Sequence, residues 1–333
     1  MIEVKRIRMA KRPVKSLSVE DFTEETYTLN ALREGEVRCH VRYISLDPYL
    51  AQMMTSWQGP ERCWEQGIIA GRMVGQVIET RDPDFSVGDW VSGDSQWQTY
   101  EQGTSQRFRK VDVTDDIPGS AYLGVLGSSG LTAWIGIHRI IRIEAGETLT
   151  ISSAAGSVGA IAGQLAKMRG ARVVGLAGGQ QKCEQVCSML GFDACVDHHA
   201  RNMQAQLAQA IDGPLHAHFE NVGAKTLDPV LSLISDGGRI GLCGLIAHYL
   251  DDKPVCLNNF RRLLTAGITL QGFRIYDHFD VAKQAHTELR AGIQSGQILI
   301  RETLTEHIEN APAAYLNMLS SGGVGKHLIH IPA

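Results

Sequence analysis

The chain has 333 residues, which is enough for two domains with sizeable cores. Its hydrophobic content of 44% and charged content of 20% are those of an ordinary globular protein, and its net charge of −4 excludes a strongly basic nucleic-acid-binding surface. No apolar run reaches the ~20 residues that cross a bilayer, and the first residues lack the apolar core of a signal peptide. Seven cysteines without a disulfide-like spacing suit a reducing compartment, so we expect a cytoplasmic protein.

Short segments of alternating apolar and polar residues characterise the N-terminal part of the chain. Residues 37–44 and 73–79 alternate in this way, and turn-forming residues such as those at 81–84 separate them. This pattern is typical of antiparallel strands. The basic residues between Lys5 and Arg12 are interrupted by apolar ones, so we interpret them as an exposed first strand and not as a targeting or RNA-binding arm.

From residue 148 to 290 the pattern changes to strands and helices in alternation. The predicted strands are 148–153, 171–176, 194–197, 216–220, 238–243 and 268–273. The predicted helices are 157–169, 180–190, 201–212, 224–235, 258–266 and 280–295. Two such βαβαβ halves make a doubly wound parallel sheet of six strands, so the fold class is α/β with a Rossmann domain. A helix at 309–320 and a strand at 326–331 follow, and we expect this tail to return to the first domain.

The junction of the first predicted strand and helix matches the dinucleotide-binding fingerprint, with Ala154 in place of its first glycine. Gly156 allows the backbone to approach a pyrophosphate, and Gly159 allows the helix to pack against the strand. Ser157 and Val158 begin the helix, whose positive dipole end faces the phosphates. These five residues are therefore predicted to bind a dinucleotide; the alternative is a purely structural βαβ turn.

The end of the second predicted strand indicates which dinucleotide is bound. NAD-selective folds place there an acidic residue that binds the ribose 2′-hydroxyl, but residues 176–179 read Leu-Ala-Gly-Gly. Lys182 follows within one turn, so a 2′-phosphate would meet a cation and the backbone amides around Gly178. Lys182 alone would be an ordinary solvated lysine, but its place beside the missing acid favours NADPH over NADH.

Nine motifs together resemble the medium-chain dehydrogenase/reductase superfamily, and within it the zinc-independent leukotriene B4 dehydrogenase/prostaglandin reductase branch. That branch includes bacterial curcumin reductases and plant double-bond reductases. The motifs extend over nearly the whole chain, at residues 10–13, 46–49, 82–85, 87–89, 130–134, 154–159, 219–223, 243–244 and 325–326. The resemblance implies a GroES-like catalytic domain of residues 1–126 and 297–333, a Rossmann NADPH-binding domain of residues 127–296, and a homodimer.

The resemblance also implies roles for individual residues. Lys182 would contact the 2′-phosphate, Asn221 the cofactor after the fourth strand, and Tyr249 would lie beside the nicotinamide ribose and the substrate. Tyr49 is similar to a pocket tyrosine of the plant members. The segment that passes the nicotinamide contains Phe273 and Tyr276.

Four positions depart from the family pattern. His198 replaces a tyrosine on the 2′-phosphate side, where its imidazole can still donate to phosphate. Gly323 replaces a frequent asparagine that contacts the cofactor in the family, so this side-chain contact is not expected here. Leu50-Ala51 replaces a frequent Met-Arg pair. Arg72 replaces an aromatic or small residue of the pocket wall, and it either faces the cleft, where it would favour carboxylate-bearing substrates, or faces outward.

The zinc ligands of the metal-dependent relatives are missing from the sequence. Residues 45–48 read Ser-Leu-Asp-Pro where those relatives have a cysteine, and residues 70–73 read Ala-Gly-Arg-Met where they have Gly-His-Glu. A metal site needs three or four converging ligands. Two pairs, His216 with His218 and Cys183 with Cys187, supply only two each, so we predict packing roles for them and no metal.

Without a Lewis acid, alcohol oxidation is disfavoured, and reduction of a carbon–carbon double bond conjugated to a carbonyl is easier to support. Tyr249 is the predicted hydrogen-bond donor to the developing enolate, and Tyr49 shapes the pocket or donates as well. The partner is thus a small α,β-unsaturated carbonyl compound. The alternatives are an NADPH:quinone reductase of the same superfamily and a non-catalytic NADPH-binding protein. The variable segments around 49–70 and 245–280 would set the substrate.

Overall fold

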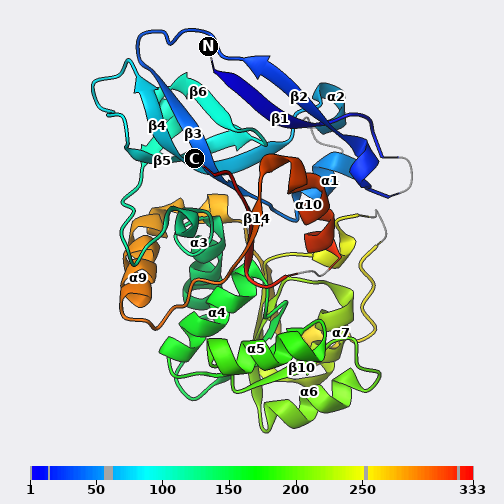
Figure 1. Cartoon of the computed structure of the whole chain (residues 1–333). Coiled ribbons are helices and arrows are strands. Elements are labelled where there is room, and N and C mark those ends of the chain that lie inside the picture. Colours follow the sequence, from blue (N-terminus) through cyan, green and yellow to red (C-terminus); the bar gives the residue numbers. More distant parts are fainter. Residues whose placement is uncertain (1, 14–15, 56–62, 251–253, 321–322, 333) are drawn as a thin grey trace. The chain divides into compact units, whose positions relative to one another are not determined.

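The computed structural model describes residues 2–13, 16–55, 63–250, 254–320 and 323–332. The chain forms two compact units (Figure 1). Unit 1 consists of Met1–Leu123, Tyr249–Asp251 and Glu302–Ala333, and unit 2 of Gly124–His248 and Asp252–Arg301. Within the described ranges, no helix has the length and apolar character needed to span a membrane.

Unit 1 is built on a seven-stranded, mostly antiparallel sheet. Its strands run in the order β14-β15-β3-β4-β5-β7, with β6 paired to β3, and β1 and β2 form a separate antiparallel pair. The bounds are β1 (Glu3–Met9), β2 (Phe22–Thr28), β3 (Glu36–Ser45), β4 (Ala70–Thr80), β5 (Trp90–Gln96), β6 (Tyr100–Thr104), β7 (Phe108–Lys110), β14 (Glu302–Glu306) and β15 (Lys326–His330). The strands predicted at 37–44 and 73–79 lie in β3 and β4. The C-terminal strand pairs with β3, so the tail returns to the first unit as expected.

Short helices and aromatic side chains complete the core of unit 1. The helices are α1 (Leu50–Thr55), α2 (Cys63–Gln66) and α10 (Ala311–Leu319). Trp97 is fully buried, stacks on Phe22 at a centroid distance of 6.1 Å and meets Tyr315 edge-on at 5.4 Å. Because large apolar surfaces bury favourably, this cluster ties the N-terminal strands to the C-terminal helix α10.

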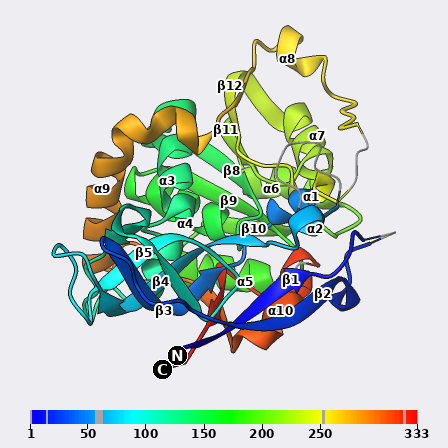
Figure 2. The ribbon, with the colours of Figure 1, turned by 90° about the horizontal axis from the view of Figure 1, so that it is seen from above.

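Unit 2 is a parallel six-stranded sheet in the order β10-β9-β8-β11-β12-β13. The strands are β8 (Thr148–Ser152), β9 (Arg172–Ala177), β10 (Ala194–Asp197), β11 (Leu215–Glu220), β12 (Ile234–Leu242) and β13 (Thr269–Gly272). This order of strands is the doubly wound 3-2-1-4-5-6 arrangement, which confirms the predicted fold class. Helices lie on both sides of the sheet (Figure 2): α3 (Ser128–Ile135), α4 (Ser157–Met168), α5 (Gln180–Leu190), α6 (Met203–Ile211), α7 (Ala224–Leu233), α8 (Arg262–Thr265) and α9 (Ala282–Gln294).

Two predicted boundaries in unit 2 were wrong. The helix predicted at 224–235 ends at Leu233, and β12 begins at Ile234 although residues 235–238, Ser-Asp-Gly-Gly, are typical of a turn. Residues 235–238 do turn: they form a bulge opposite Leu215–Ala217 of β11, and Gly237 within it adopts a left-handed φ of 73°. The helix predicted at 258–266 is only the four residues of α8, since the residues before it form turns.

Candidate dinucleotide site

The turn between β8 and α4 is tight, and only small residues fit into it. Ser153 adopts a left-handed φ of 51°, and its carbonyl accepts a hydrogen bond from the N–H of Gly156 at 2.9 Å. A Cβ atom on Gly159 would lie 2.3 Å from that same carbonyl oxygen. Ala154 is tolerated at the first fingerprint position because it faces Gly175 of β9, where a Cβ atom would come within 2.8 Å of its methyl group.

The N-terminus of α4 is arranged to receive an anion. Gly156 is the N-cap residue, and its carbonyl accepts the N–H of Ala160 at 3.0 Å. The N–H groups of Ser157, Val158 and Gly159 precede that bond and point out of the helix end, where the helix dipole is positive. The Ser157 hydroxyl donates to Ser129 Oγ at 2.7 Å, so its backbone N–H remains the group that faces a ligand.

The end of β9 brings Gly178, Lys182 and His198 together. A Cβ atom on Gly178 would lie 3.3 Å from His198 Nε2, a close contact that would push the imidazole aside by a few tenths of an ångström. Lys182 is half-buried in the first turn of α5, and burial lowers its pKa. The charge of Lys182 also lowers the pKa of His198, so these two side chains lie near each other. Gly178, Lys182 and His198, all predicted to bind the 2′-phosphate, are therefore neighbours in the structure.

His198 lies in a cationic environment. Burial, followed by the charges of His199, Lys225 and Lys182, lowers its pKa to about 4, while the charge of Asp197 opposes them. Its Nε2 is 2.9 Å from His199 Nε2, and its buried Nδ1 has no hydrogen-bond partner within the part of the chain that the structure describes. These positive groups fit a phosphate, and Lys225 was missed because it follows a different strand of the sheet.

Asn221 is hydrogen-bonded to Ser152, the last residue of β8. Its backbone N–H donates to Ser152 Oγ at 2.7 Å, and its side-chain Nδ2 donates to the Ser152 carbonyl at 2.8 Å. Strands β8 and β11 are neighbours whose connections leave in opposite directions, which is the switch point where doubly wound folds bind ligands. The structure therefore places Asn221 at the same sheet edge as the fingerprint. No sequence pattern predicts the contacts of Ser152 with Asn221, because the two residues lie at the ends of different strands.

Phe273 and Tyr276 have different surroundings. Phe273 follows β13, its N–H donates to the Leu242 carbonyl at 3.3 Å, and its ring meets Phe219 edge-on at 6.2 Å. Phe273 thus lies at the carboxyl edge of the sheet. Tyr276, three residues further on, is 66% exposed and contacts Phe279 at a centroid distance of 5.9 Å.

The two predicted tyrosines of the substrate site both belong to unit 1. Tyr249 is half-buried and packs against the hydrophobic core of that unit. Tyr49 is 48% exposed and precedes α1. The turn that carries Tyr49 is fixed, because the Tyr315 hydroxyl donates to the carbonyls of Asp47 and Pro48 at 3.3 and 3.4 Å.

Arg72 and Gly323 also lie in unit 1. The half-buried Arg72 is close enough to contribute to the lowered pKa of Asp47. Gly323 has a φ of 69°, and a Cβ atom there would lie 2.3 Å from His327 Cε1. An asparagine at 323 would therefore displace His327, which explains the glycine at this position.

The paired His and Cys residues have protein partners. His216 Nδ1 accepts the backbone N–H of Thr148 at 3.0 Å, and the thiols of Cys183 and Cys195 are hydrogen-bonded to each other. Among the residues with described positions, no group of three or more His, Cys, Asp or Glu side chains could hold a metal ion.

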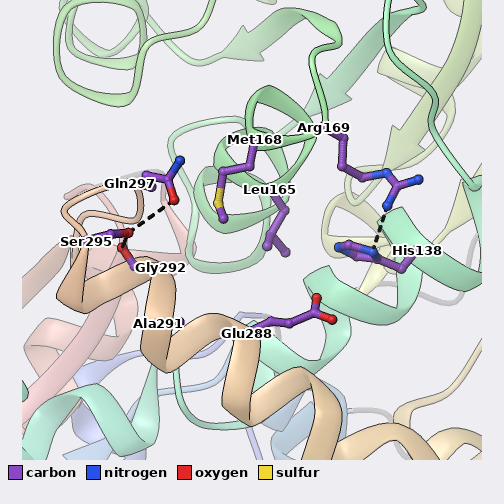
Figure 3. Close-up of a pocket in the computed structure, with 9 residues that line it drawn as sticks. All are labelled: His138, Leu165, Met168, Arg169, Glu288, Ala291, Gly292, Ser295 and Gln297. Atoms are coloured by element: carbon purple, nitrogen blue, oxygen red, sulfur yellow. Dashed lines mark hydrogen bonds between the residues drawn. The ribbon is translucent and has the colours of Figure 1, made fainter.

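A pocket of about 440 Å³ lies at the C-terminal end of α4, away from the fingerprint at its N-terminal end (Figure 3). It is lined by His138, Leu165, Met168, Arg169, Glu288, Ala291, Gly292, Ser295 and Gln297. Its charged groups are already engaged: Glu288 accepts the indole N–H of Trp134 at 2.6 Å, and Arg169 donates to the Ile143 carbonyl at 2.8 Å. The pocket therefore adds no residue to the dinucleotide site.

Comparisons with known proteins agree with this geometry. The chain matches a model described as the N-terminal domain of oxidoreductase at residues 5–111, and one described as zinc-binding dehydrogenase at residues 157–290. It is 36% identical to an NADPH-dependent curcumin reductase of Escherichia coli (strain K12), covering 97% of this chain and 95% of the relative. It is 33% identical to the 2-alkenal reductase (NADP(+)-dependent) of Nicotiana tabacum, covering 87% and 85%.

The fold is also similar to a solved structure. CurA from Vibrio vulnificus in complex with NADPH superposes with a TM-score of 0.90 at 32% identity, and 99% of each chain is covered. Together with the motifs, these relationships confirm the resemblance seen in the sequence. The chain belongs to the medium-chain dehydrogenase/reductase superfamily, in its zinc-independent leukotriene B4 dehydrogenase/prostaglandin reductase branch.

Proposed function

We propose that this protein reduces the carbon–carbon double bond of α,β-unsaturated aldehydes and ketones, with NADPH as the hydride donor. The observation that carries the proposal is the full-length similarity to an NADPH-dependent curcumin reductase, combined with a dinucleotide site that has cations where NAD-selective folds have an acid. The NADP(+)-dependent 2-alkenal reductase of tobacco supports the same class of substrate.

The residues of unit 2 fit the parts of this cofactor. The backbone around Ala154, Gly156 and the first turn of α4 receives the pyrophosphate. The 2′-phosphate is bound by Gly178, Lys182 and His198. The nicotinamide end of the cofactor lies next to Asn221 and Phe273. When bound, NADPH supplies the hydride that the substrate accepts at its β-carbon.

The protein's own contribution to the chemistry is a hydrogen bond to the substrate. As the β-carbon is reduced, negative charge moves to the carbonyl oxygen as an enolate. The Tyr249 hydroxyl donates to that oxygen, and Tyr49 shapes the pocket or donates as well. A neutral tyrosine polarises the oxygen without a net change of charge, and solvent delivers the proton to the α-carbon.

The two units divide these tasks. We assign NADPH binding to residues 127–296, because the fingerprint, the cationic cluster and Asn221 all lie there. We assign the GroES-like catalytic domain to residues 1–126 and 297–333, whose compact unit also includes Tyr249.

A homodimer and a cytoplasmic location complete the proposal. Strand β13 ends the order of the parallel sheet, so its outer edge is available for pairing with a second copy. Exposed apolar side chains precede it, with Leu264 85% exposed and Phe260 60% exposed. Light scattering should give twice the chain mass, and Leu264→Glu should shift it to the monomer. The seven cysteines, which form no disulfide among the described residues, suit a reducing compartment.

The decisive experiment measures NADPH consumption against a panel of enones and enals, with product analysis to show which double bond is lost. A naphthoquinone assayed beside an alkenal distinguishes quinone reduction, and NADPH binding without turnover of either substrate would indicate a non-catalytic protein. An enone acid compared with its methyl ester tests Arg72: an equal kcat/KM for both would exclude a carboxylate-binding role.

A further inference from the structure

His218 and Glu220 form a buried pair on β11, next to Asn221. Both side chains are fully buried, and because they are two residues apart on a strand they lie on one face of it. His218 Nε2 is 2.7 Å from Glu220 Oε2, and His218 Nδ1 is 2.8 Å from Thr150 Oγ1. Since a ring nitrogen this close to a carboxylate must donate, the contact fixes the proton on Nε2.

The second carboxylate oxygen of Glu220 organises the start of α7. It accepts hydrogen bonds from the Ser152 hydroxyl at 2.8 Å, from the Thr226 hydroxyl at 2.9 Å, and from the backbone N–H groups of Val222 and Gly223. Burial alone would raise the pKa of Glu220, but the hydrogen bonds and charge of His218 and those backbone amides outweigh it and hold the pKa below its usual range. Glu220 is therefore a buried, fully engaged carboxylate.

Two further sets of hydrogen bonds, one through the side chain of Glu220 and one through its backbone segment, connect this residue to the site. The Ser152 hydroxyl, which donates to Glu220, accepts the backbone N–H of Asn221. The loop at 243–248 is hydrogen-bonded to the same segment. The backbone N–H groups of Cys243 and Gly244 donate to the Glu220 carbonyl. The N–H of Ile246 donates to the Asn221 carbonyl at 3.1 Å, and that of Ala247 to the Val222 carbonyl at 3.0 Å. The next residue along the chain is Tyr249.

We propose that His218 and Glu220 are positioning residues that hold Asn221 and the loop leading to Tyr249 in the geometry needed for hydride transfer. Their complete burial means that they act through the segment at 221–223 and the loop at 243–248, and not by contact with a ligand. This inference rests on the proposed function for the roles of Asn221 and Tyr249, and it adds the buried pair on which both depend.

Other titratable groups face the same region. Cys243 lies at the end of β12, and burial together with the charge of Glu220 raises its pKa to about 12, so it stays a neutral thiol. His248 Nε2 accepts the backbone N–H of Ala224 at 3.4 Å. His216 is two residues before His218 and bonds to Thr148 at the opposite end of the strand. None of these contacts the Glu220 carboxylate through a hydrogen bond in the described residues.

The test compares Glu220→Gln and His218→Gln with two controls. His216→Gln alters a histidine of the same strand, and Leu207→Ala removes a buried core side chain of unit 2. NADPH affinity is measured by fluorescence titration, kcat and KM by enone reduction, and stability by thermal unfolding. We expect Glu220→Gln to weaken NADPH binding and lower kcat about tenfold each, since it leaves buried N–H donors competing for a weaker acceptor.

The controls separate positioning from stability. Leu207→Ala should lower the melting temperature and leave both NADPH affinity and kcat within about twofold of the native protein, as should His216→Gln. His218→Gln keeps the carboxylate but removes a group that holds its pKa down. Its NADPH affinity should therefore fall as the pH falls from 8 to ~5, a range in which Glu220 stays ionised in the native protein.

The proposal is overturned if both Glu220→Gln and His218→Gln bind NADPH and turn over within about twofold of the native protein. It is also overturned if Leu207→Ala, matched for loss of stability, has the same kinetic defect. If Glu220→Gln does not fold, the test rests on His218→Gln alone, through its NADPH affinity, its kcat and the pH dependence of that affinity. A native protein that binds NADPH but reduces no enone would refute the proposed function, while the binding measurements would still test the positioning role.

Discussion

The carboxylate of Asp197 accepts a hydrogen bond from the backbone N–H of Gly179 at 2.8 Å. It also accepts the N–H of His199 at 2.9 Å, and these two bonds hold the pKa of Asp197 below its usual range. The turn after β9 is thereby joined to the turn after β10. Because this carboxylate accepts hydrogen bonds from backbone amides, we propose that the positive charges of Lys182 and Lys225, which act on the neighbouring His198, select the cofactor.

Removal of the Lys182 charge should affect the two nicotinamide cofactors unequally. Lys182→Ala loses a charge-assisted contact to the 2′-phosphate, so we expect KM for NADPH to rise about tenfold or more while KM for NADH changes less than about twofold. Lys167→Ala is the matched control, since Lys167 pairs with Asp193 and lies in the last turn of α4. Steady-state kinetics with both cofactors are the measurement, and equal increases in both KM values would reject the assignment.

Loss of the Tyr249 hydroxyl should slow the reaction without weakening cofactor binding. A single donor to a developing oxyanion contributes a factor of about 100 in kcat, so Tyr249→Phe should lower kcat for enone reduction by that order and leave the NADPH dissociation constant unchanged. Tyr100→Phe, which removes a hydroxyl at the start of β6 in the same unit, should have no effect. If Tyr249→Phe leaves both kcat and KM unaltered, the Tyr249 hydroxyl is not the hydrogen-bond donor to the enolate oxygen.

His198 should link NADP⁺ binding to pH. Its pKa of about 4 in the free protein would be raised by a bound phosphate, so binding takes up a proton and affinity increases as the pH falls towards 4. The titration of the phosphate itself is common to all variants, so the informative quantity is the difference between the native protein and His198→Gln from pH 4.5 to 8. Identical profiles, measured by calorimetry, would show that His198 does not contact the phosphate.

A methyl group at Gly159 should damage the dinucleotide site. A Cβ atom there would lie 2.3 Å from a backbone oxygen that cannot rotate away. We therefore expect Gly159→Ala to cost about 1–3 kcal/mol of unfolding free energy and to weaken NADPH binding. Gly272→Ala is the control, because a Cβ atom at Gly272 meets nothing within 4 Å. If the two variants unfold at the same urea concentration, the steric account of the turn is wrong.

The buried ion pair of Lys326 and Asp47 should be costly to break. Lys326 Nζ is 2.5 Å from Asp47 Oδ1 and also donates to the Leu46 carbonyl. Burial would raise the pKa of Asp47, but the charge and hydrogen bond of Lys326 hold it below the usual value of 3.8. Lys326→Met should therefore lose about 3–5 kcal/mol, and adding Asp47→Asn should recover part of that loss.

The same pair predicts the direction of the pH dependence. Because the folded-state pKa of Asp47 is depressed, its contribution to stability is present above pH 3.8 and is lost as the pH falls through the lower folded value. Urea unfolding between pH 2 and 7 measures this. The native protein should lose stability at the acid end more steeply than the Lys326→Met/Asp47→Asn variant, and parallel curves would contradict the prediction.

Much of unit 2 could be predicted from local pattern. The strand predicted at 148–153, the turn after it and the helix predicted at 157–169 follow one another directly in the sequence, so the apolar strand, the small residues of the turn and the helical pattern reveal the fingerprint together. Lys225 and the Glu220–Ser152 contact could not be predicted, because the groups that meet are far apart in the chain and only the parallel pairing of β8 with β11 brings them together.

The position of β15 has a consequence for biosynthesis. This strand lies between β14 and β3, yet it follows the whole of unit 2 in the chain. A ribosome therefore completes the six-stranded parallel sheet while the end of β3 at residues 43–45 still lacks β15, its neighbour there. An unpaired, apolar strand edge is a site of aggregation. Expression of a chain shortened before β14 should consequently give insoluble material, and slow translation through unit 2 lengthens the time for which chaperones must protect β3.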